Sequence, residues 1–254
     1  MIEIQDLCFS YGEKPFTDHL SLTLTDGTLT ALIGENGSGK STLLKLITGN
    51  EKSSLGNILL DGVNIRDMKK REIAHRLSYF PQSRPTPDMR VHELVMMGRY
   101  PFTNGFSSAT KKDLALTEKA MEKMAVLPFA DRNLQTLSFG ERQRVYLAML
   151  LAQDTKHTLF DEPTNFLDIS AKFAMLDTLV DLKNEGKCVL CVLHDLSLAM
   201  RYADRLLVMK NGNLFADGTP DALYENGAIA KAFGVHLTRF EQNGEKIYTV
   251  LSKT

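Results

Sequence analysis

The sequence of 254 residues lacks any apolar stretch long enough to cross a membrane, and neither sign of charge is in excess. Its longest apolar stretches, such as residues 146–152 and 189–193, are far shorter than the roughly 20 residues of a membrane-spanning helix. The formal net charge of -1 gives no general attraction for nucleic acid or for an anionic lipid surface. We therefore expect no nucleic-acid partner, and any association with a membrane must come through a protein partner.

A secretory signal is also lacking. Residues 1–6, MIEIQD, carry acids where a signal peptide carries bases, and no apolar core segment follows them. Cysteine is scarce as well: the three present are odd in number and lie in apolar surroundings, which is typical of a reducing compartment. We expect a protein that is not exported, with enough hydrophobic residues, 43%, for a real core.

Cys188 and Cys191 form a C-x-x-C pair, a spacing that can serve a metal or a redox disulfide. They lie in residues 187–193, which the sequence predicts to be a buried strand. Residues three apart on a strand point to opposite faces, so the two thiols cannot meet. Two packed core cysteines are the favoured interpretation.

The hydrophobic pattern predicts an α/β protein. Residues 1 to about 33 form short alternating runs with turns at 11–15 and 26–27, as antiparallel strands do. Residues 29–49 read as a strand, a glycine loop and an amphipathic helix. Residues 91–127 have helical periodicity, and Pro101 with the Asn104-Gly105 turn separates two helices.

From Thr158 onward, strands alternate with helices, which implies βαβ units and a parallel sheet. The expected strands are 158–160, 187–193 and 205–209, and the expected helices are about 170–184 and 195–202. Asn211-Gly212 predicts a hairpin, and a last hairpin is expected around Asn243-Gly244.

Residues 34–41, GENGSGKS, fit the pattern G-x-x-x-x-G-K-[ST] between a strand and a helix. Glycines there let backbone N–H groups face the α and β phosphates of a nucleotide. Lys40 reaches the β and γ phosphates, and Ser41 can ligate Mg²⁺. The sequence therefore predicts a site for a nucleoside triphosphate with Mg²⁺.

A second motif, Asp161-Glu162, ends the strand at 158–160. At the phosphate edge of a sheet, Asp161 can hold Mg²⁺ through water and Glu162 can polarise an attacking water. The alternative is that both acids cap the turn before Pro163. Beside a phosphate loop the hydrolytic interpretation is favoured.

A third motif lies at residues 137–144, LSFGERQR, where Ser138 and Gly140 open an apolar helix. The unsatisfied N–H groups and the dipole of such a helix start favour an anion. The chain has only one nucleotide loop, so this second phosphate-binding device suggests a nucleotide held by another subunit. We expect an ATPase that works as a pair.

In their order along the chain, these motifs resemble the ATP-binding subunits of ABC transporters, and the resemblance covers nearly the whole chain. It implies a P-loop core of mostly parallel sheet with flanking helices, an N-terminal antiparallel β subdomain and an inserted α-helical subdomain. The expected boundaries are 1–84 for the β subdomain with the P-loop, 85–155 for the helical subdomain and 156–254 for the rest of the core. The helical subdomain includes the third motif, residues 137–144, which matches the signature of the family.

The resemblance also implies a role for each matching residue. Tyr11 stacks on adenine, Gln82 contacts Mg²⁺, the attacking water and the permease, and Asp168 belongs to the inter-subunit loop. Ser138 and Gly140 close over the partner's γ-phosphate, Asp161 is the metal-site acid, Glu162 the catalytic base and His194 the switch histidine. The P-loop matches are Gly34, Asn36, Gly37, Ser38, Gly39, Lys40, Ser41 and Thr42.

The chain departs from the family at several positions. The signature usually has glycine at Phe139 and glutamine at Glu141. Phenylalanine adds bulk beside a phosphate-facing turn and disfavours positive φ, so we expect altered closure over the nucleotide. His157 and Thr158 are polar where the family prefers apolar residues, which leaves the start of that strand open.

A finer resemblance, to the ATPases of importers for iron–siderophore complexes, haem and vitamin B12, comes from residues 79–82, 91–95, 98–102 and 150–154. The implied partners are a second copy of the chain, an integral membrane permease and, indirectly, a substrate-binding protein. This places the chain at the cytoplasmic face of the cell membrane. The alternatives are a zinc or manganese importer, a soluble ABC-type ATPase of DNA repair or translation, and a module that binds ATP without hydrolysis.

Residues 82–105 are the expected docking segment for a permease loop. An adaptable apolar groove there needs exposed apolar side chains. The alternative is that they face the chain's own core. The candidates are Met89, Met96, Met97, Tyr100 and Phe102.

Overall fold

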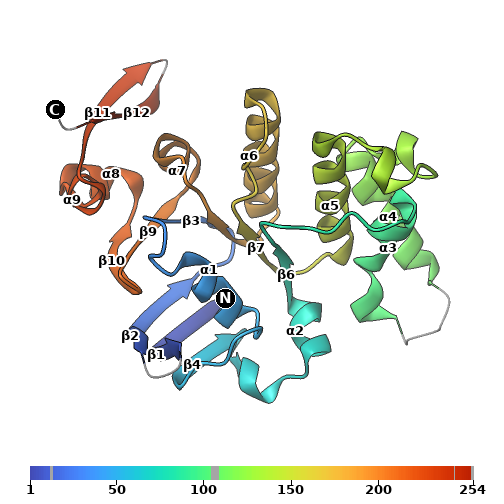
Figure 1. Cartoon of the computed structure of the whole chain (residues 1–254), viewed down its shortest axis with the longest axis horizontal. Coiled ribbons are helices and arrows are strands. Elements are labelled where there is room, and N and C mark those ends of the chain that lie inside the picture. Colours follow the sequence, from blue (N-terminus) through green and yellow to red (C-terminus); the bar gives the residue numbers. More distant parts are fainter. Residues whose placement is uncertain (12–13, 104–108, 243, 253–254) are drawn as a thin grey trace.

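The computed structural model describes residues 1–11, 14–103, 109–242 and 244–252. Figure 1 shows an antiparallel sheet from the N-terminal segment below a central sheet, a group of helices at one side and a C-terminal hairpin at the other. The turn predicted at 11–15 includes residues 12 and 13, and the predicted Asn104-Gly105 turn and Asn243 also lie outside the described residues.

The first sheet has the strand order β2-β1-β4-β5, with every neighbouring pair antiparallel. Its strands are β1 (Ile2–Tyr11), β2 (Lys14–Leu24), β4 (Leu55–Leu60) and β5 (Val63–Asn64). Ile2, Ile4 and Leu7 of β1 are buried against the rest of the molecule. The antiparallel strands predicted for this segment are confirmed.

The central sheet has the order β10-β9-β3-β8-β7-β6 and is parallel except between β9 and β10. Its strands are β3 (Leu29–Gly34), β6 (Leu77–Phe80), β7 (His157–Asp161), β8 (Cys188–Val192), β9 (Arg205–Lys210) and β10 (Asn213–Gly218). Every residue of β3, β7 and β8 is buried, as expected of strands covered on both faces.

Helices flank this sheet and two hydrophobic clusters cover its faces. The helices of the core are α1 (Lys40–Ile47), α2 (Lys70–Arg76), α6 (Ile169–Asn184) and α7 (Leu196–Tyr202). Cys188 belongs to one cluster and Cys191 to the other, so the two thiols point to opposite faces as predicted. Burial raises the pKa of both, to about 12 for Cys188, which keeps them protonated.

The start of β7 differs from the strand predicted at 158–160. It begins one residue earlier, because His157 is fully buried and pairs through Nε2 with Asp61 Oδ2 at 3.1 Å. A partner distant in sequence therefore allows a polar residue to open the strand.

The predicted hairpin at Asn211-Gly212 is confirmed between β9 and β10. Both residues have positive φ, 50° and 81°, as a two-residue type I′ turn requires.

The helical region lies at the right of Figure 1 and contains α3 (Val91–Met97), α4 (Lys111–Lys123) and α5 (Phe139–Gln153). Short 3₁₀ turns connect these helices: η2 (Tyr100–Phe102) between α3 and α4, and η3 (Leu127–Phe129) and η4 (Leu134–Thr136) between α4 and α5. A further 3₁₀ turn, η1 (Ile65–Asp67), connects β5 to α2. Pro101 lies within η2, between α3 and α4, where the sequence predicted the break. No helix of the described ranges combines the length and apolarity needed to span a bilayer.

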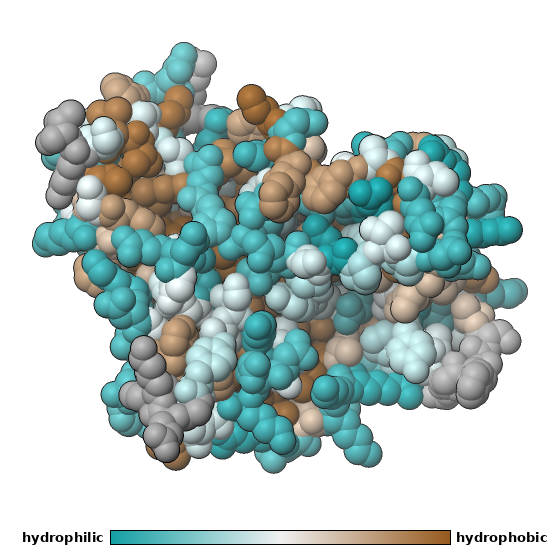
Figure 2. Space-filling model, in the orientation of Figure 1, coloured by the Kyte–Doolittle hydropathy of each residue, from teal (hydrophilic) through white to brown (hydrophobic). Residues whose placement is uncertain are grey.

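The C-terminal part follows β10 with α8 (Pro220–Glu225) and α9 (Ala228–Phe233), then the hairpin of β11 (Val235–Gln242) and β12 (Glu245–Ser252). β12 packs against α7. Figure 2 shows hydrophobic residues gathered over this C-terminal part at the upper left. Within it, Asp221 accepts hydrogen bonds from Arg239, Lys246 and Tyr248, and its pKa is lowered to about 2, chiefly by the bond from Lys246.

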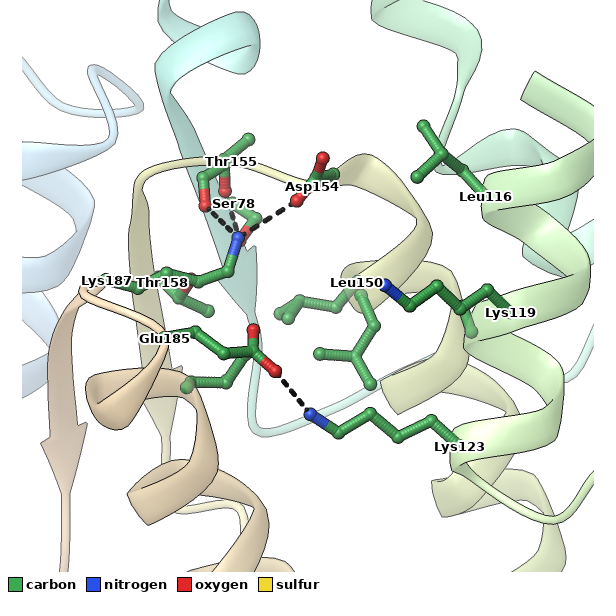
Figure 3. A pocket seen from close by; sticks show the side chains of 13 residues that line it. Ser78, Leu116, Lys119, Lys123, Leu150, Asp154, Thr155, Thr158, Glu185 and Lys187 are labelled. Carbon is green, nitrogen blue, oxygen red and sulfur yellow. Dashed lines mark hydrogen bonds and ion pairs between the residues drawn. The ribbon is translucent and has the colours of Figure 1, made fainter. Parts of the chain in front are cut away.

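A cavity of about 130 Å³ marks the junction between the helical region and the core. Figure 3 shows lysines of both parts around it. Lys123 of α4 pairs with Glu185 at 2.7 Å, and Lys187 donates to Asp154 Oδ1 at 3.0 Å and to the Thr155 carbonyl at 2.8 Å. Because α4, α5 and α6 all end here, these cations offset the negative ends of three helices.

A buried ion pair organises the helical region itself. Arg99 Nε lies 2.9 Å from Asp113 Oδ1, and the two side chains are only 4% and 5% exposed. Arg99 also donates to the carbonyls of Ala152 and Gln153 at the end of α5, while Thr110 donates to Asp113 at the start of α4. One guanidinium, which follows α3, thus joins all three helices.

We expect Arg99→Met to lower the free energy of unfolding by about 3 kcal/mol, because it leaves a buried carboxylate without its cation. The loss lies at the low end of the range for such pairs, since Thr110 still donates to Asp113. Urea-induced unfolding followed by circular dichroism measures it.

Arg90→Met is the matched control. Arg90 and Asp131 are 3.8 Å apart and 64% and 95% exposed, so this substitution should cost less than about 1 kcal/mol. Equal losses in the two variants would contradict the structural importance of the buried pair.

Candidate nucleotide site

The phosphate loop connects the end of β3 at Gly34 to the start of α1 at Lys40. Gly39 caps the helix with φ 107°, and a side chain on it would approach the Phe16 ring to 2.8 Å. A side chain on Gly34 would meet the Met209 carbonyl at 2.4 Å. Only glycine fits both positions, so the loop keeps an open cradle of backbone N–H groups.

The polar side chains of this loop fit a phosphate chain. The buried Ser38 hydroxyl has no hydrogen-bond partner among the described residues, and Lys40 Nζ donates to the carbonyls of Gly34, at 2.8 Å, and Glu35, at 3.0 Å. Burial lowers the pKa of Lys40, while Glu162 and Asp161 act in the opposite sense. A buried donor without a partner is costly, and triphosphate oxygens would satisfy it.

A pocket of about 720 Å³ collects the predicted residues from several segments. Its lining consists of Phe16, Asn36, Gly37, Gly39, Lys40, Ser41, Thr42, Gln82, Glu162, Asn165 and His194. Tyr11 stands beside the pocket: its hydroxyl lies 2.9 Å from Thr42 Oγ1, and its ring meets Phe16 edge-on at 5.5 Å. Phe16, which sequence reasoning missed, is the aromatic ring in the lining itself.

Asp161 ends β7 inside this region. Its Oδ1 lies 3.4 Å from the Ser41 hydroxyl, and its Oδ2 accepts a hydrogen bond of 3.1 Å from the Tyr79 hydroxyl. Burial raises the pKa of the Asp161 carboxyl, although the hydrogen bond from Tyr79 acts against this. Ser41, Asp161 and the amide oxygen of Gln82 are hard oxygen donors, the kind that Mg²⁺ prefers.

Glu162 follows in the left-handed region, at φ 52°, which is uncommon for a non-glycine residue. Its Oε2 accepts hydrogen bonds of 2.5 Å from both Gln82 and Asn165, and its Oε1 pairs with His194 Nε2. Backbone strain of this kind persists where surrounding contacts fix it, often at functional sites. The carboxylate is therefore held in one place by side chains from three segments.

Asn165 was not singled out by sequence reasoning, although its position three residues after Glu162 is a signal. Its backbone N–H bonds to the Glu162 carbonyl at 3.2 Å, which closes a turn and returns the amide to the carboxylate. Asparagine favours such turns because its side chain bonds locally.

The signature segment forms the start of α5 and lies outside the pocket of the phosphate loop. Ser138 caps α5: its hydroxyl accepts from the Glu141 N–H at 3.3 Å, and its own N–H donates to the Glu141 carboxylate at 2.7 Å. Glu141 thus completes a capping box. Ser138, Gly140 and Asp168 line a separate groove of about 670 Å³ between α5 and α6.

Phe139 occupies the first turn of α5, in helical conformation, so the expected conflict with positive φ does not arise. Its ring is exposed and packs edge-on against Phe166, at 6.2 Å between centroids. Phe166 is 85% exposed and has φ 61°. The departure from glycine adds an aromatic contact between the signature and the segment before Asp168.

A hydrogen-bonded chain links α5 to the segments that precede Gln82 and follow Glu162. Arg84 donates to the Pro81 carbonyl at 2.8 Å and to Gln143 Oε1 of α5, and its guanidinium stacks over Phe80 at 4.0 Å. Gln143 in turn donates to the Pro163 carbonyl at 3.2 Å. A movement of α5 would therefore shift the backbone next to both Gln82 and Glu162.

The expected docking segment divides between core and surface. Met89 packs against the hydrophobic cluster that contains Cys191. Met96 accepts a hydrogen bond from the Thr117 hydroxyl at 3.6 Å, and the Phe102 ring stacks on His75 at 4.6 Å. Tyr100 is 70% exposed, and Met97 is exposed as well. Tyr100 borders a groove of about 480 Å³ with Lys70, Arg71, Ala74, Pro101 and Thr103.

Known proteins share this arrangement. The family model described as ABC transporter matches residues 17–165. The petrobactin import ATP-binding protein FpuD of Bacillus anthracis is 37% identical over 91% of this chain and 86% of its own length. The ferric enterobactin transport ATP-binding protein FepC of Escherichia coli K12 is 38% identical over 91% and 86%.

Among solved structures, the ADP conformation of MJ1267, an ATP-binding cassette of an ABC transporter, superposes with a TM-score of 0.81. It is 24% identical and covers 92% of this chain and 98% of its own, a likeness that concerns the fold. The predicted core, antiparallel sheet and helical region are confirmed together. By its sequence match and its relatives, this chain belongs to the ATP-binding subunits of ABC transporters, the ATPases of that family.

Proposed function

We propose that this chain hydrolyses MgATP as half of a symmetric pair and so powers an importer for an iron–siderophore or related metal chelate. The observation that carries the proposal is the Glu162 carboxylate, held by Gln82, Asn165 and His194 at the pocket that also contains Lys40. A fixed carboxylate beside a phosphate cradle is suited to orienting and deprotonating water.

Each side chain then has a role in hydrolysis. Lys40, Ser38 and the loop N–H groups bind the phosphates, and Glu162 accepts the proton of the attacking water. His194 holds Glu162 Oε1 in place. Ser41, Gln82 and Asp161 would hold Mg²⁺, which would supply positive charge to offset that of the β and γ phosphates.

We propose a pair of chains because the signature lies apart from the phosphate loop of its own chain. Ser138 and Gly140 line the groove between α5 and α6 and take no part in the pocket of the phosphate loop. The start of a fifteen-residue helix attracts an anion, so a second copy supplies the phosphate, with Asp168 at the contact between copies.

The permease is the proposed membrane partner, at the cytoplasmic face. Tyr100 and Met97 offer it exposed apolar surface. Elsewhere in the chain, Arg84 and Gln143 connect α5 to the segments of Gln82 and Glu162. We assign residues 1–84 and 156–254 to the nucleotide core with its β subdomain, and 85–155 to the helical subdomain that moves with the permease.

The cargo is inferred from the relatives. The two relatives named above serve petrobactin and ferric enterobactin, which are both iron chelates, and each match spans about nine-tenths of this chain. We therefore place iron–siderophore import ahead of zinc or manganese import and of a soluble ATPase. A substrate-binding protein delivers the chelate to the permease.

Replacing Glu162 by Gln should reduce the turnover number for ATP by about 10²–10⁴-fold, because the proton acceptor is lost while the shape is kept. Phosphate release measures turnover, and size-exclusion chromatography with ATP should show the variant trapped as a dimer. Glu185→Gln is the control and should keep wild-type turnover, because Glu185 is an exposed acid at the end of α6, away from the nucleotide pocket. A fully active Glu162→Gln protein would remove Glu162 from the mechanism.

Replacing Phe16 by Ala should weaken ATP binding on the order of tenfold, as loss of one aromatic contact to a base does. Binding of tripolyphosphate, which has no base, should change much less, since the phosphate cradle remains. Isothermal titration calorimetry compares the two ligands, with Tyr11→Ala in parallel. Equal losses for ATP and tripolyphosphate would mean that Phe16 only shapes the loop around Gly39.

A further inference from the structure

Tyr79 lies on β6, the edge strand of the central sheet beside β7. It pairs in register with Leu159, so Asp161 is its diagonal neighbour two residues further along β7. Residues two apart on a strand point to the same face, so Asp161 lies on the face of the sheet that carries Leu159 and Tyr79. The half-buried ring spans this distance, and its hydroxyl donates to Asp161 Oδ2 at 3.1 Å.

The two oxygens of Asp161 have different surroundings. Oδ2 is engaged by Tyr79, whereas Oδ1 faces the Ser41 hydroxyl at 3.4 Å, the long end of a hydrogen bond. Lys40, a cation of the same loop, donates its hydrogen bonds to backbone carbonyls instead. The carboxylate therefore has one oxygen fixed and one oxygen turned toward the site.

Tyr79 is suited to be a permanent donor. A tyrosine phenol keeps its proton at neutral pH, because its ordinary pKa is about 10. A neutral hydroxyl also adds no positive charge that would compete with a cation at Asp161. An arginine or lysine in the same place would bind the carboxylate at the expense of a metal ion.

We propose that Tyr79 is a positioning residue for the metal site: its hydroxyl holds Asp161 Oδ2 so that Oδ1 is presented, beside Ser41, to the Mg²⁺ that accompanies ATP. The inference rests on the proposed function, since it assumes that MgATP is the ligand. Partners that orient a metal ligand from behind typically change metal affinity by about 10–100-fold when removed.

The test is Tyr79→Phe, which keeps the ring and removes the hydroxyl. It is made in Glu162→Gln protein so that bound ATP is not consumed. ATP affinity is measured by calorimetry with saturating Mg²⁺ and again in EDTA, and the ratio of the two reports how much the protein's contacts to the metal add. We expect Tyr79→Phe to reduce this ratio by about 10–100-fold and to leave the affinity in EDTA within about twofold.

Tyr248→Phe is the matched control, because it removes a tyrosine hydroxyl that donates to a carboxylate, Asp221, in the C-terminal part. Its ratio should equal that of the parent protein. A second arm places Tyr79→Phe in an Asp161→Asn background, where the hydroxyl has no carboxylate to orient and its loss should change the ratio no further. This arm also separates a positioning role from a general loss of folding.

The results distinguish the two levels of the proposal. An unchanged ratio in Tyr79→Phe, or an equal fall in the Asp161→Asn background, overturns the role of Tyr79 and leaves ATP hydrolysis intact. If the parent protein binds ATP equally with and without Mg²⁺, or not at all, the proposed function itself fails.

Discussion

The register of the parallel strands is the constraint on which the nucleotide site depends. Leu32 of β3 lies beside Val192 of β8, and Val192 lies beside Asp161 of β7. β6 continues the same register, since Phe80 pairs with Phe160, the residue before Asp161. Because the strands are parallel, the residues that follow these positions all emerge at one edge of the sheet.

Those following residues are the ones proposed to bind and hydrolyse ATP. Gly34 opens the phosphate loop two residues beyond Leu32, His194 comes two beyond Val192, and Glu162 comes directly after Asp161. Gln82 follows β6 in the same way and reaches Glu162 from the sheet edge. A slip of one residue between β7 and β8 would turn every side chain of the slipped strand to the other face and separate Glu162 from His194.

The helical region depends on this sheet in a different way. Its own helices are joined by the buried Arg99–Asp113 pair, and Arg84 and Gln143 are among the contacts that connect α5 to the segments of Gln82 and Glu162. The cavity of Figure 3 lies at the opposite end of the strands, where Lys123 and Glu185 bridge α4 and the end of α6. The helical region also shares one buried hydrophobic cluster with the central sheet, so its connection to the core is apolar as well as polar.

The sequence by itself determined the motifs, because each depends on neighbouring residues alone. These motifs are a glycine loop between a strand and a helix, two acids after a buried strand, and a serine at the start of a helix. The same reasoning predicted the opposite orientation of Cys188 and Cys191 and the Asn211-Gly212 turn. What only the tertiary structure decided are contacts between segments far apart in the chain, such as His157 with Asp61, Tyr79 with Asp161, and Phe16 with the phosphate loop. These depend on strand register and on side-chain direction, which no local pattern specifies, and they determine how the atoms of the site are held.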